Sequence, residues 1–354
     1  MTEPFGPGPT LADRMRRHAG DSQHLYGQLM RSMADDWERG GPVQEICAGW
    51  EDAPPGWVIQ LRLLAGLFRV VLTGRAPELE PFYPCLGGTA DPGKAWPAVR
   101  EVLRTHIDEL HDSLNIAPQT NEVGRANALI VGIFRVAEQT QRSKIRLLEP
   151  GSSAGLNLLV DRFRFVNPTW AYGPSDSPVT LAGGVVGEVR PVSFDIVSRR
   201  GCDVSPVDVS TEEGRRRLRS FVWPFHVERH ERLTGALALA QASPPEVDQG
   251  SAAAWLEARL AEAPPDDVVT VVWQSITRQY WPADEVERVD ELIRHAAERS
   301  SVAHVSMEYP DVVSPAGAEL TIACSGVAAD DRFDYQRVGS VGDHGFPVTV
   351  ADAT

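Results

Sequence analysis

The sequence contains little cysteine, which argues against two kinds of structural support. Only four cysteines occur in 354 residues, they are far apart, and no two form a C-x-x-C pair. Structural zinc sites and the disulfide frameworks of small secreted domains both need closely spaced cysteines. We therefore expect no metal site and a protein that folds in a reducing cytoplasm; the four positions are Cys47, Cys85, Cys202 and Cys324.

Positive charge is also scarce. Lysine and arginine number 34 against 49 acidic residues, the net charge is -15, and only Lys94 and Lys144 are lysines. A protein that binds nucleic acid or an anionic membrane needs a cationic surface. We therefore expect a small-molecule ligand, no nucleic-acid partner and no membrane, and the sequence leaves the oligomeric state open.

Long apolar runs are absent as well. No uninterrupted stretch reaches the roughly 20 residues of a membrane-spanning helix. Residues 1–10 are rich in Pro and Gly and lack the basic and apolar regions of a signal peptide. We expect a cytoplasmic protein with one large domain or two ordinary ones.

Residues 1–142 are predicted to form a helical N-terminal region packed on the core. Apolar residues recur there at spacings of three and four. Asp21 or Ser22 is expected to cap a second helix. We interpret His106 and His111 as packing or surface residues. Helices are expected at 11–37 with a break at 20–22, at 57–72, and at 96–114.

The stretch from Ile145 to Asn157 organises the second part of the chain, 143–354. An apolar run ends at Glu149, a loop of small residues follows, and helical spacing resumes over 156–163. A helix that starts at the carboxyl end of a parallel strand directs its free N–H groups at a ligand. We predict a ligand site that includes Glu149, Gly151, Ser152, Ser153, Ala154, Gly155 and Asn157.

The spacing of Glu149, Gly151, Ser153 and Gly155 resembles the E-x-G-x-G-x-G loop of S-adenosylmethionine-dependent methyltransferases, with serine in place of the middle glycine. The resemblance implies S-adenosylmethionine as cofactor. In a doubly wound sheet the acid that follows the second strand commonly holds a ribose. A strand is predicted from Phe194, and the candidates after it are Asp203 and Asp208.

The same loop also fits G-x-S-x-G, the nucleophile elbow of α/β-hydrolases, with Ser153 as nucleophile. Ser153, Asp311 and His344 follow one another in the order of that family's triad. Hydrolases of this fold, however, normally place several strands before the elbow, and the preceding residues here read as helical. A turn that binds nothing and a non-catalytic nucleoside-binding or interaction domain remain alternatives.

A dense polar cluster, residues 119–125, opens the apolar helix predicted at 126–136. A capping box with Thr120 as N-cap accounts for Thr120 and Glu122 but not for Asn121 and Arg125. Because the helix leads directly into the strand at Ile145, we expect its first turn near the ligand site.

Residues 267–275 read as a central parallel strand beside the Ile145 strand, because they are nearly continuous in β-branched residues. Polar groups follow this strand and the strand predicted at 302–308, where open α/β sheets bind ligands. If the protein is an enzyme, the acceptor pocket is expected to draw on Asn121, Arg125, Ser275, Tyr280, Glu308 and His344.

Two further segments are predicted to contain no ligand or metal site. Residues 212–240 are predicted to be helical with a break at Pro224. His226 and His230 flank Glu228 in the order H-x-E-x-H, whereas the metal motif is H-E-x-x-H. We therefore interpret this stretch as a solvated helix face with Glu–Arg pairing. Residues 165–192, rich in Gly, Pro and Ser, are predicted to be an insertion that carries a hairpin.

Several signatures occur in a fixed order: 119–122, the loop 149–157, Arg200 to Asp208, Trp223-Pro224, and His344-Gly345. Together they resemble an uncharacterised bacterial family common in actinobacteria, the domain of unknown function 2332 family. The resemblance brings no established activity with it.

Strands near 145, 194, 246, 268, 302, 320 and 335 predict the fold class. Helices separate the first five. This pattern is typical of an α/β, methyltransferase-like (Rossmann-like) fold with a seven-stranded, mostly parallel sheet. Our interpretation is an S-adenosylmethionine-dependent methyltransferase-like protein that acts on a small molecule, with a serine hydrolase as the alternative.

Overall fold

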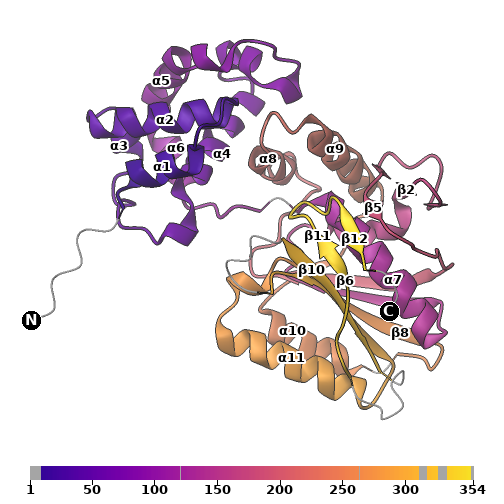
Figure 1. Cartoon of the computed structure of the whole chain (residues 1–354). Coiled ribbons are helices and arrows are strands. Elements are labelled where there is room, and N and C mark those ends of the chain that lie inside the picture. The colour runs from indigo at the N-terminus through magenta and orange to yellow at the C-terminus, as the bar shows by residue number, and fades with distance from the viewer. Residues whose placement is uncertain (1–8, 120, 263, 311–316, 326–332, 352–354) are drawn as a thin grey trace, which may run out of the picture. The chain divides into compact units, whose positions relative to one another are not determined.

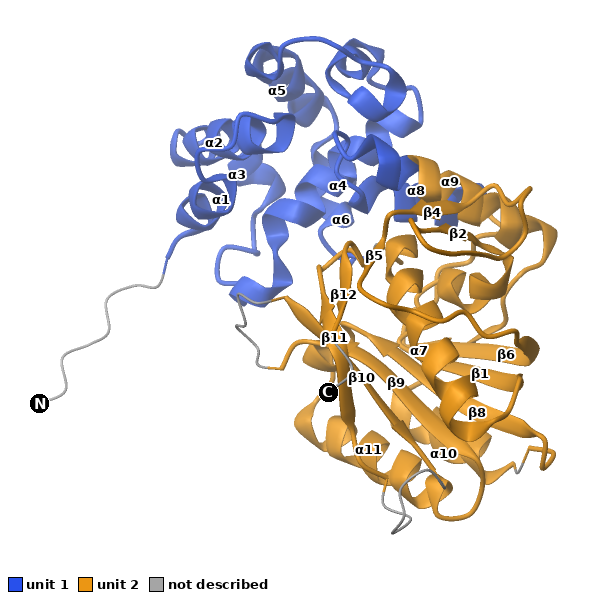
Figure 2. Ribbon diagram, turned by 45° about the vertical axis from the view of Figure 1, so that its right-hand side comes forward, with its two compact units in different colours: residues 1–120, 212–230 blue, residues 121–211, 231–354 orange. Residues whose placement is uncertain are grey.

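A computed structural model of the chain describes residues 9–119, 121–262, 264–310, 317–325 and 333–351. The chain forms two compact units, each discontinuous in sequence (Figure 2): unit 1 is Met1–Thr120 with Glu212–His230, and unit 2 is Asn121–Thr211 with Glu231–Thr354. This division differs from the predicted boundary at residue 142. Helix α7 (Ala126–Thr140) belongs to unit 2 because most of its residues are buried there.

Unit 1 is helical, as predicted, and its described residues include no strand. One cluster of buried apolar side chains runs through its helices and gathers residues from Leu11 to Leu114. The helices are α1 (Leu11–Ala19), α2 (Leu25–Glu38), α3 (Pro42–Ile46), α4 (Ile59–Leu72), α5 (Trp96–Thr105), α6 (Ile107–Ser113) and α8 (Glu212–Phe221), with 3-10 turns η1 (Pro55–Trp57), η2 (Pro77–Phe82), η3 (Pro84–Leu86) and η4 (Pro92–Lys94).

Histidines decide two helix boundaries in unit 1. The chain breaks between α1 and α2 as predicted, but His24 caps α2 in place of Asp21 or Ser22, because its Nδ1 accepts from the Gly27 N–H at 3.0 Å. The helix predicted at 96–114 is two helices, since His106 leaves the helical conformation and its Nδ1 contacts the Val102 carbonyl at 3.0 Å. Both contacts therefore stabilise the ends of helices.

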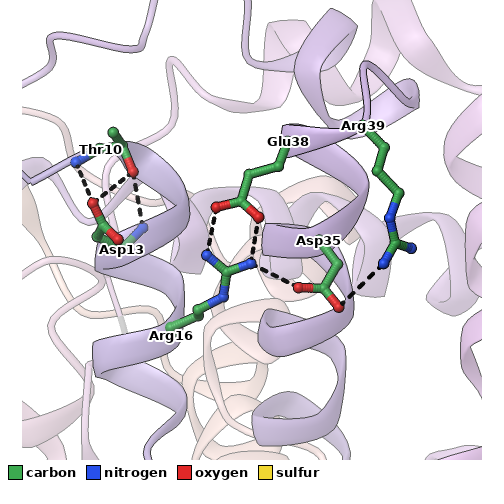
Figure 3. Close-up of polar contacts among 6 residues, drawn as sticks. All are labelled: Thr10, Asp13, Arg16, Asp35, Glu38 and Arg39. Atoms are coloured by element: carbon green, nitrogen blue, oxygen red, sulfur yellow. Dashed lines mark hydrogen bonds and ion pairs between the residues drawn. The ribbon is translucent and has the colours of Figure 1, made fainter.

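Polar contacts link the first two helices (Figure 3). Thr10 and Asp13 form a capping box at the start of α1, and the Arg16 guanidinium donates to Glu38 at 2.6 Å and to Asp35 at 2.7 Å. The three side chains of this ion-pair group are about 37–49% exposed, so solvent screens the attraction and each pair contributes little to stability.

Among the described residues, one helical stretch, α4 with the turn before it, is long and apolar enough to cross a membrane. Residues Pro55–Leu72 have a mean hydropathy of 1.4, and 67% of the stretch is buried inside the structure. Length and composition alone would suit a membrane span. Its place in the apolar cluster of unit 1 accounts for the same composition, as in the core helix of a soluble protein.

Unit 2 is built on a mixed sheet with the order β5-β12-β11-β10-β9-β8-β1-β6-β7 (Figure 1). The strands from β7 through β9 in this order are parallel, and β1 lies between β6 and β8, as predicted for the strand at 267–275. The main strands are β1 (Lys144–Pro150), β6 (Asp195–Asp203), β7 (Val247–Gln249), β8 (Val268–Ser275), β9 (Val302–Glu308), β10 (Ala318–Cys324) and β11 (Gln336–Val341).

The prediction of a seven-stranded sheet is wrong, because the sheet has nine strands. All seven predicted strands occur, but β12 (Val348–Val350) and β5 (Val185–Val186) extend one edge. Strands β9, β10, β11 and β12 are successive antiparallel neighbours. The connections between them are too short for the helical crossover that parallel pairing requires.

The predicted insertion contains a hairpin, as expected. Strands β2 (Arg164–Val166) and β3 (Ala171–Tyr172) pair antiparallel, and β4 (Thr180–Ala182) adds to β2. Strand β5 leaves this small sheet and pairs with β12, so the insertion closes the edge of the main sheet.

Helices cover both faces of the main sheet. Helices α10 (Ala252–Ala261) and α11 (Ala283–Ala297) lie side by side on one face (Figure 1). They share a buried core with Leu148, Val272 and Val302. Helix α7 lies on the other face, where Gly132 permits close approach, because a Cβ there would collide with Val305. Side chains alternate along β1, so Glu149 points toward the α7 face.

The segment after β1 differs from the expected α-helix. Residues Leu156–Arg162 form 3-10 turns (η6) with a kink at Leu159. Five consecutive residues, 156–160, are buried, so the segment lacks the polar face that stabilises an amphipathic α-helix. Because no regular α-helix starts here, a helix dipole contributes less to ligand binding. Individual polar groups must bind the ligand instead.

Candidate functional site

The loop after β1 is fastened to the neighbouring strand β6. The N–H groups of Gly151 and Ser152 donate to the Cys202 carbonyl at 2.8 and 3.0 Å, and Ser152 Oγ donates to the same oxygen. Gly151 has φ +75°, which favours glycine, and Ala154 is buried. These contacts hold the loop at the carboxyl edge of the sheet.

Asp203, at the end of β6, holds the middle of this loop. Its Oδ2 accepts from the Ser153 N–H at 2.9 Å and its Oδ1 from the Ser205 N–H at 2.9 Å. Ser153 thereby keeps a left-handed backbone, φ +56°, which a non-glycine residue adopts at a cost. The other candidate, Asp208, lies in an exposed turn and accepts from the Ser210 N–H. Asp203 is the acid at the strand end.

The polar cluster that precedes α7 contacts the same loop, as predicted. Asn121 Oδ1 accepts from the Leu156 N–H at 3.0 Å, and the Glu122 carbonyl accepts from Asn157 Nδ2 at 3.3 Å. Glu122 Oε1 accepts from the Gly124 N–H and caps the turn η5 (Val123–Arg125). The proposed cap Thr120 lies outside the described residues.

Arg125 connects three segments of the site. Its Nη1 donates to the Ser275 carbonyl at 2.9 Å and its Nε to the Asp343 carbonyl at 3.3 Å. Burial lowers the Arg125 pKa, and the negative charges of Glu122 and Glu308 oppose that effect. Its hydrogen bonds go to neutral carbonyl groups, and within the described part of the chain it forms no ion pair, so its charge can attract a ligand anion.

Glu308, the last residue of β9, faces the loop after β8. Its carboxylate accepts from the N–H groups of Thr277 at 3.0 Å and Arg278 at 3.4 Å. Burial raises the Glu308 pKa to about 7, although these hydrogen bonds and Arg125 lower it. Ile276 has φ +49°, so a second strained residue lies in this edge of the sheet.

Glu149 is the most deeply buried acid of the site. It is 3% exposed, and its Oε2 has no hydrogen-bond partner among the described residues. Burial raises the Glu149 pKa to about 8; Arg125 and the nearby Trp273 indole lower it, and Asp203 raises it further. Two carboxyl groups that titrate near neutral pH beside an arginine are typical of functional sites.

The remaining predicted site residues lie at the rim. Tyr280, in the turn η7 (Arg278–Tyr280), is 75% exposed. His344 is half exposed, with Nδ1 3.9 Å from Glu122 Oε2. Tyr280 nevertheless acts electrostatically on Arg125.

The serine hydrolase arrangement is not assembled. Ser153 Oγ is buried and has no hydrogen-bond partner within the described ranges, so it does not pair with His344. Asp311, the third member of the predicted triad, lies outside the described residues. A nucleophile elbow needs a serine within hydrogen-bonding reach of its base.

A fluorophosphonate probe is therefore expected to leave Ser153 unlabelled. The wild type and the Ser153→Ala variant should give the same background by mass spectrometry, because no base activates the hydroxyl. A serine hydrolase labelled in the same reaction is the control. Stoichiometric labelling that disappears in Ser153→Ala would contradict this expectation.

Two residues of the site were not predicted. Thr277 supplies an N–H to Glu308, and its side chain occupies the space beside Gly151. Tyr309 donates to Asp343 Oδ1 at 3.0 Å. Each follows a parallel strand of the sheet within two residues, so position after a strand was the available signal.

No metal centre is indicated. In the described ranges, no group of three or more His, Cys, Asp or Glu side chains is arranged to hold a metal ion. His230 is buried, which lowers its pKa to about 4. The solvated face predicted for this stretch is therefore wrong at His230, which is 7% exposed because its ring packs against Phe68 with the ring centres 5.8 Å apart.

Comparison with known proteins identifies one family. The model of the family described as "Uncharacterized protein conserved in bacteria (DUF2332)" matches residues 10–350. No curated protein and no solved structure matches the chain.

Proposed function

The chain belongs to the DUF2332 family, and we propose that its unit 2 binds S-adenosylmethionine or a related nucleoside over residues 149–157 and methylates a small molecule. The family description assigns no activity, so the proposal relies on the site. The strands β7-β6-β1-β8-β9 provide a parallel sheet whose chain order reverses at β1. Ligands of open α/β sheets bind at such a switch point.

One observation carries the proposal. Three polar atoms on the stretch 149–157 are buried and have no partner among the described residues: Glu149 Oε2, Ser153 Oγ and Asn157 Oδ1. The three residues are 3%, 7% and 2% exposed. A buried polar atom without a hydrogen bond costs about 1–3 kcal/mol, so such a group points to a missing partner. A nucleoside with hydroxyl and amino groups can supply donors to these oxygens.

Two charged residues near this stretch, Arg125 and Glu308, suit the other requirements of a methyl transfer. S-adenosylmethionine, when bound, supplies an electrophilic methyl group. Arg125 can bind a carboxylate of the ligand or the acceptor. Glu308, with a pKa of about 7, can accept the proton that an acceptor loses as it is methylated. The fixed loops orient the reactants and exclude water.

Calorimetric titration of the full chain tests this proposal. We expect S-adenosylmethionine and S-adenosylhomocysteine to bind with micromolar affinity, and Arg125→Met to weaken binding at least tenfold, about 1.4 kcal/mol. Arg135→Met, on the helix α7 that follows Arg125 and with its side chain in a surface pair with Glu138, is the control and should bind as the wild type does. No heat of binding at millimolar ligand, from protein shown to be folded, would rule out the proposal.

A further inference from the structure

Unit 1 contains a buried arginine that forms no ion pair among the described residues, although Glu213 and Glu109 act on it electrostatically. Arg69, on α4, is 9% exposed. Its Nη1 donates to Ser220 Oγ at 3.1 Å, and its guanidinium lies 5.9 Å from the centre of the Phe221 ring. Its Nη2 is buried and has no hydrogen-bond partner among the described residues. A buried cation without a counter-charge is expensive unless something else pairs with it.

Two tyrosine hydroxyls close to Arg69 are also buried without a hydrogen-bond partner among the described residues. Tyr26 and Tyr83 are 2% and 1% exposed, and each hydroxyl lacks a partner within the described residues. The Tyr83 ring stacks on Phe68, the residue before Arg69, with ring centres 4.7 Å apart. Burial raises the Tyr26 pKa well above its usual value, and both Tyr83 and Arg69 act on it electrostatically. The three groups are therefore neighbours.

The hydrogen-bonding capacity and charge of these three groups indicate which kind of ligand they would bind. A guanidinium nitrogen can only donate hydrogen bonds, and a tyrosine hydroxyl can donate one. One water molecule accepts two hydrogen bonds, whereas a carboxylate offers about four acceptor sites. One guanidinium balances one negative charge, which suits a carboxylate better than a phosphate dianion. Ser220 Oγ is already engaged, because it donates to the Arg217 carbonyl at 2.7 Å.

We infer that unit 1 holds a second ligand site, in which Arg69, Tyr26 and Tyr83 bind a small carboxylate. This site uses none of the residues assigned to the nucleoside site. It gives unit 1 a ligand-binding role of its own, and the two sites can be tested separately.

The test uses the full chain and two conservative variants. Thermal unfolding is followed in sodium acetate, in inorganic phosphate and in sodium chloride at equal ionic strength. For the wild type we expect acetate to raise the unfolding temperature of unit 1 relative to chloride, in a saturable way and more than phosphate does. The double variant Tyr26→Phe/Tyr83→Phe keeps both rings, and we expect at least a tenfold loss of acetate affinity.

Tyr172→Phe is the matched control. It removes a tyrosine hydroxyl in unit 2, which accepts from the Phe194 N–H at 3.4 Å, and should leave the acetate effect unchanged. Equal unfolding curves of the wild type in acetate and chloride would overturn the inference. An acetate effect that survives in Tyr26→Phe/Tyr83→Phe would overturn it too, and so would a larger effect of phosphate than of acetate.

Discussion

Gly151→Ala is expected to destabilise unit 2 by about 2–4 kcal/mol and to abolish nucleoside binding. Two costs add. Alanine at φ +75° is strained, which costs about 1 kcal/mol. Its Cβ would also collide with the Thr277 side chain, and overpacking costs about 1–3 kcal/mol. Thr277 cannot rotate away easily, because a β-branched side chain is stiff.

Gly183→Ala is the matched control for Gly151→Ala. Gly183 lies in the same unit with φ +64°, and a Cβ there meets nothing within 4 Å. It should lose about 1 kcal/mol, the strain alone. Native-state hydrogen exchange of the β1 and β8 amides measures the free energy of opening in unit 2 separately from unit 1. Equal losses in the two variants would contradict the described packing of the loop against Thr277.

Glu149→Gln is expected to change the pH dependence of stability. The pKa of Glu149 is about 8 when folded, against a usual value of 4.5. Between these values the folded state binds more protons than the unfolded state, so this residue's contribution falls as pH rises from 4.5 to about 8. Glutamine carries no charge at any pH. The variant should resemble the wild type near pH 5 and become the more stable protein as the pH approaches 8 and beyond.

The size of this effect has a ceiling. Each unit of pKa shift corresponds to about 1.4 kcal/mol, so the full effect above pH 8 is at most roughly 5 kcal/mol. We expect a difference of about 2 kcal/mol or more between pH 5 and pH 9. Glu138→Gln, in a surface pair with Arg135, should show no such trend. A pH-independent difference between Glu149→Gln and the wild type would show that the carboxyl group is not forced to stay protonated.

Much of the sheet followed from local patterns. The strand that became β8 is nearly continuous in apolar and β-branched residues, and β1 and β9 are buried over most of their length, as expected for parallel strands covered on both faces. The two-residue strand β5 has no pattern of its own, and its place at the edge of the sheet could not be predicted. The 3-10 turns after β1 were missed because Leu156–Val160 matches helical spacing while every side chain is buried.

The site was predicted where polar residues follow strands and missed where backbone groups do the binding. Asp203 and Glu308 end β6 and β9, and their carboxylates do lie at the sheet edge. Their partners are the N–H groups of Ser153, Thr277 and Arg278, which any residue type could provide. Arg125 lies at the same edge because it donates to the carbonyl groups of Ser275 and Asp343, which are 150 and 218 positions further along the chain.

Residues 149–157 are expected to bind a nucleoside ligand, and the structure of the full chain with S-adenosylhomocysteine tests this most directly. We expect the ligand over the loop between β1 and η6, with hydrogen bonds to Glu149 Oε2 or Ser153 Oγ, the atoms that lack partners in the described structure. Ligand bound elsewhere, with these atoms still without partners, would contradict the account, and so would failure to bind under conditions in which the protein is folded.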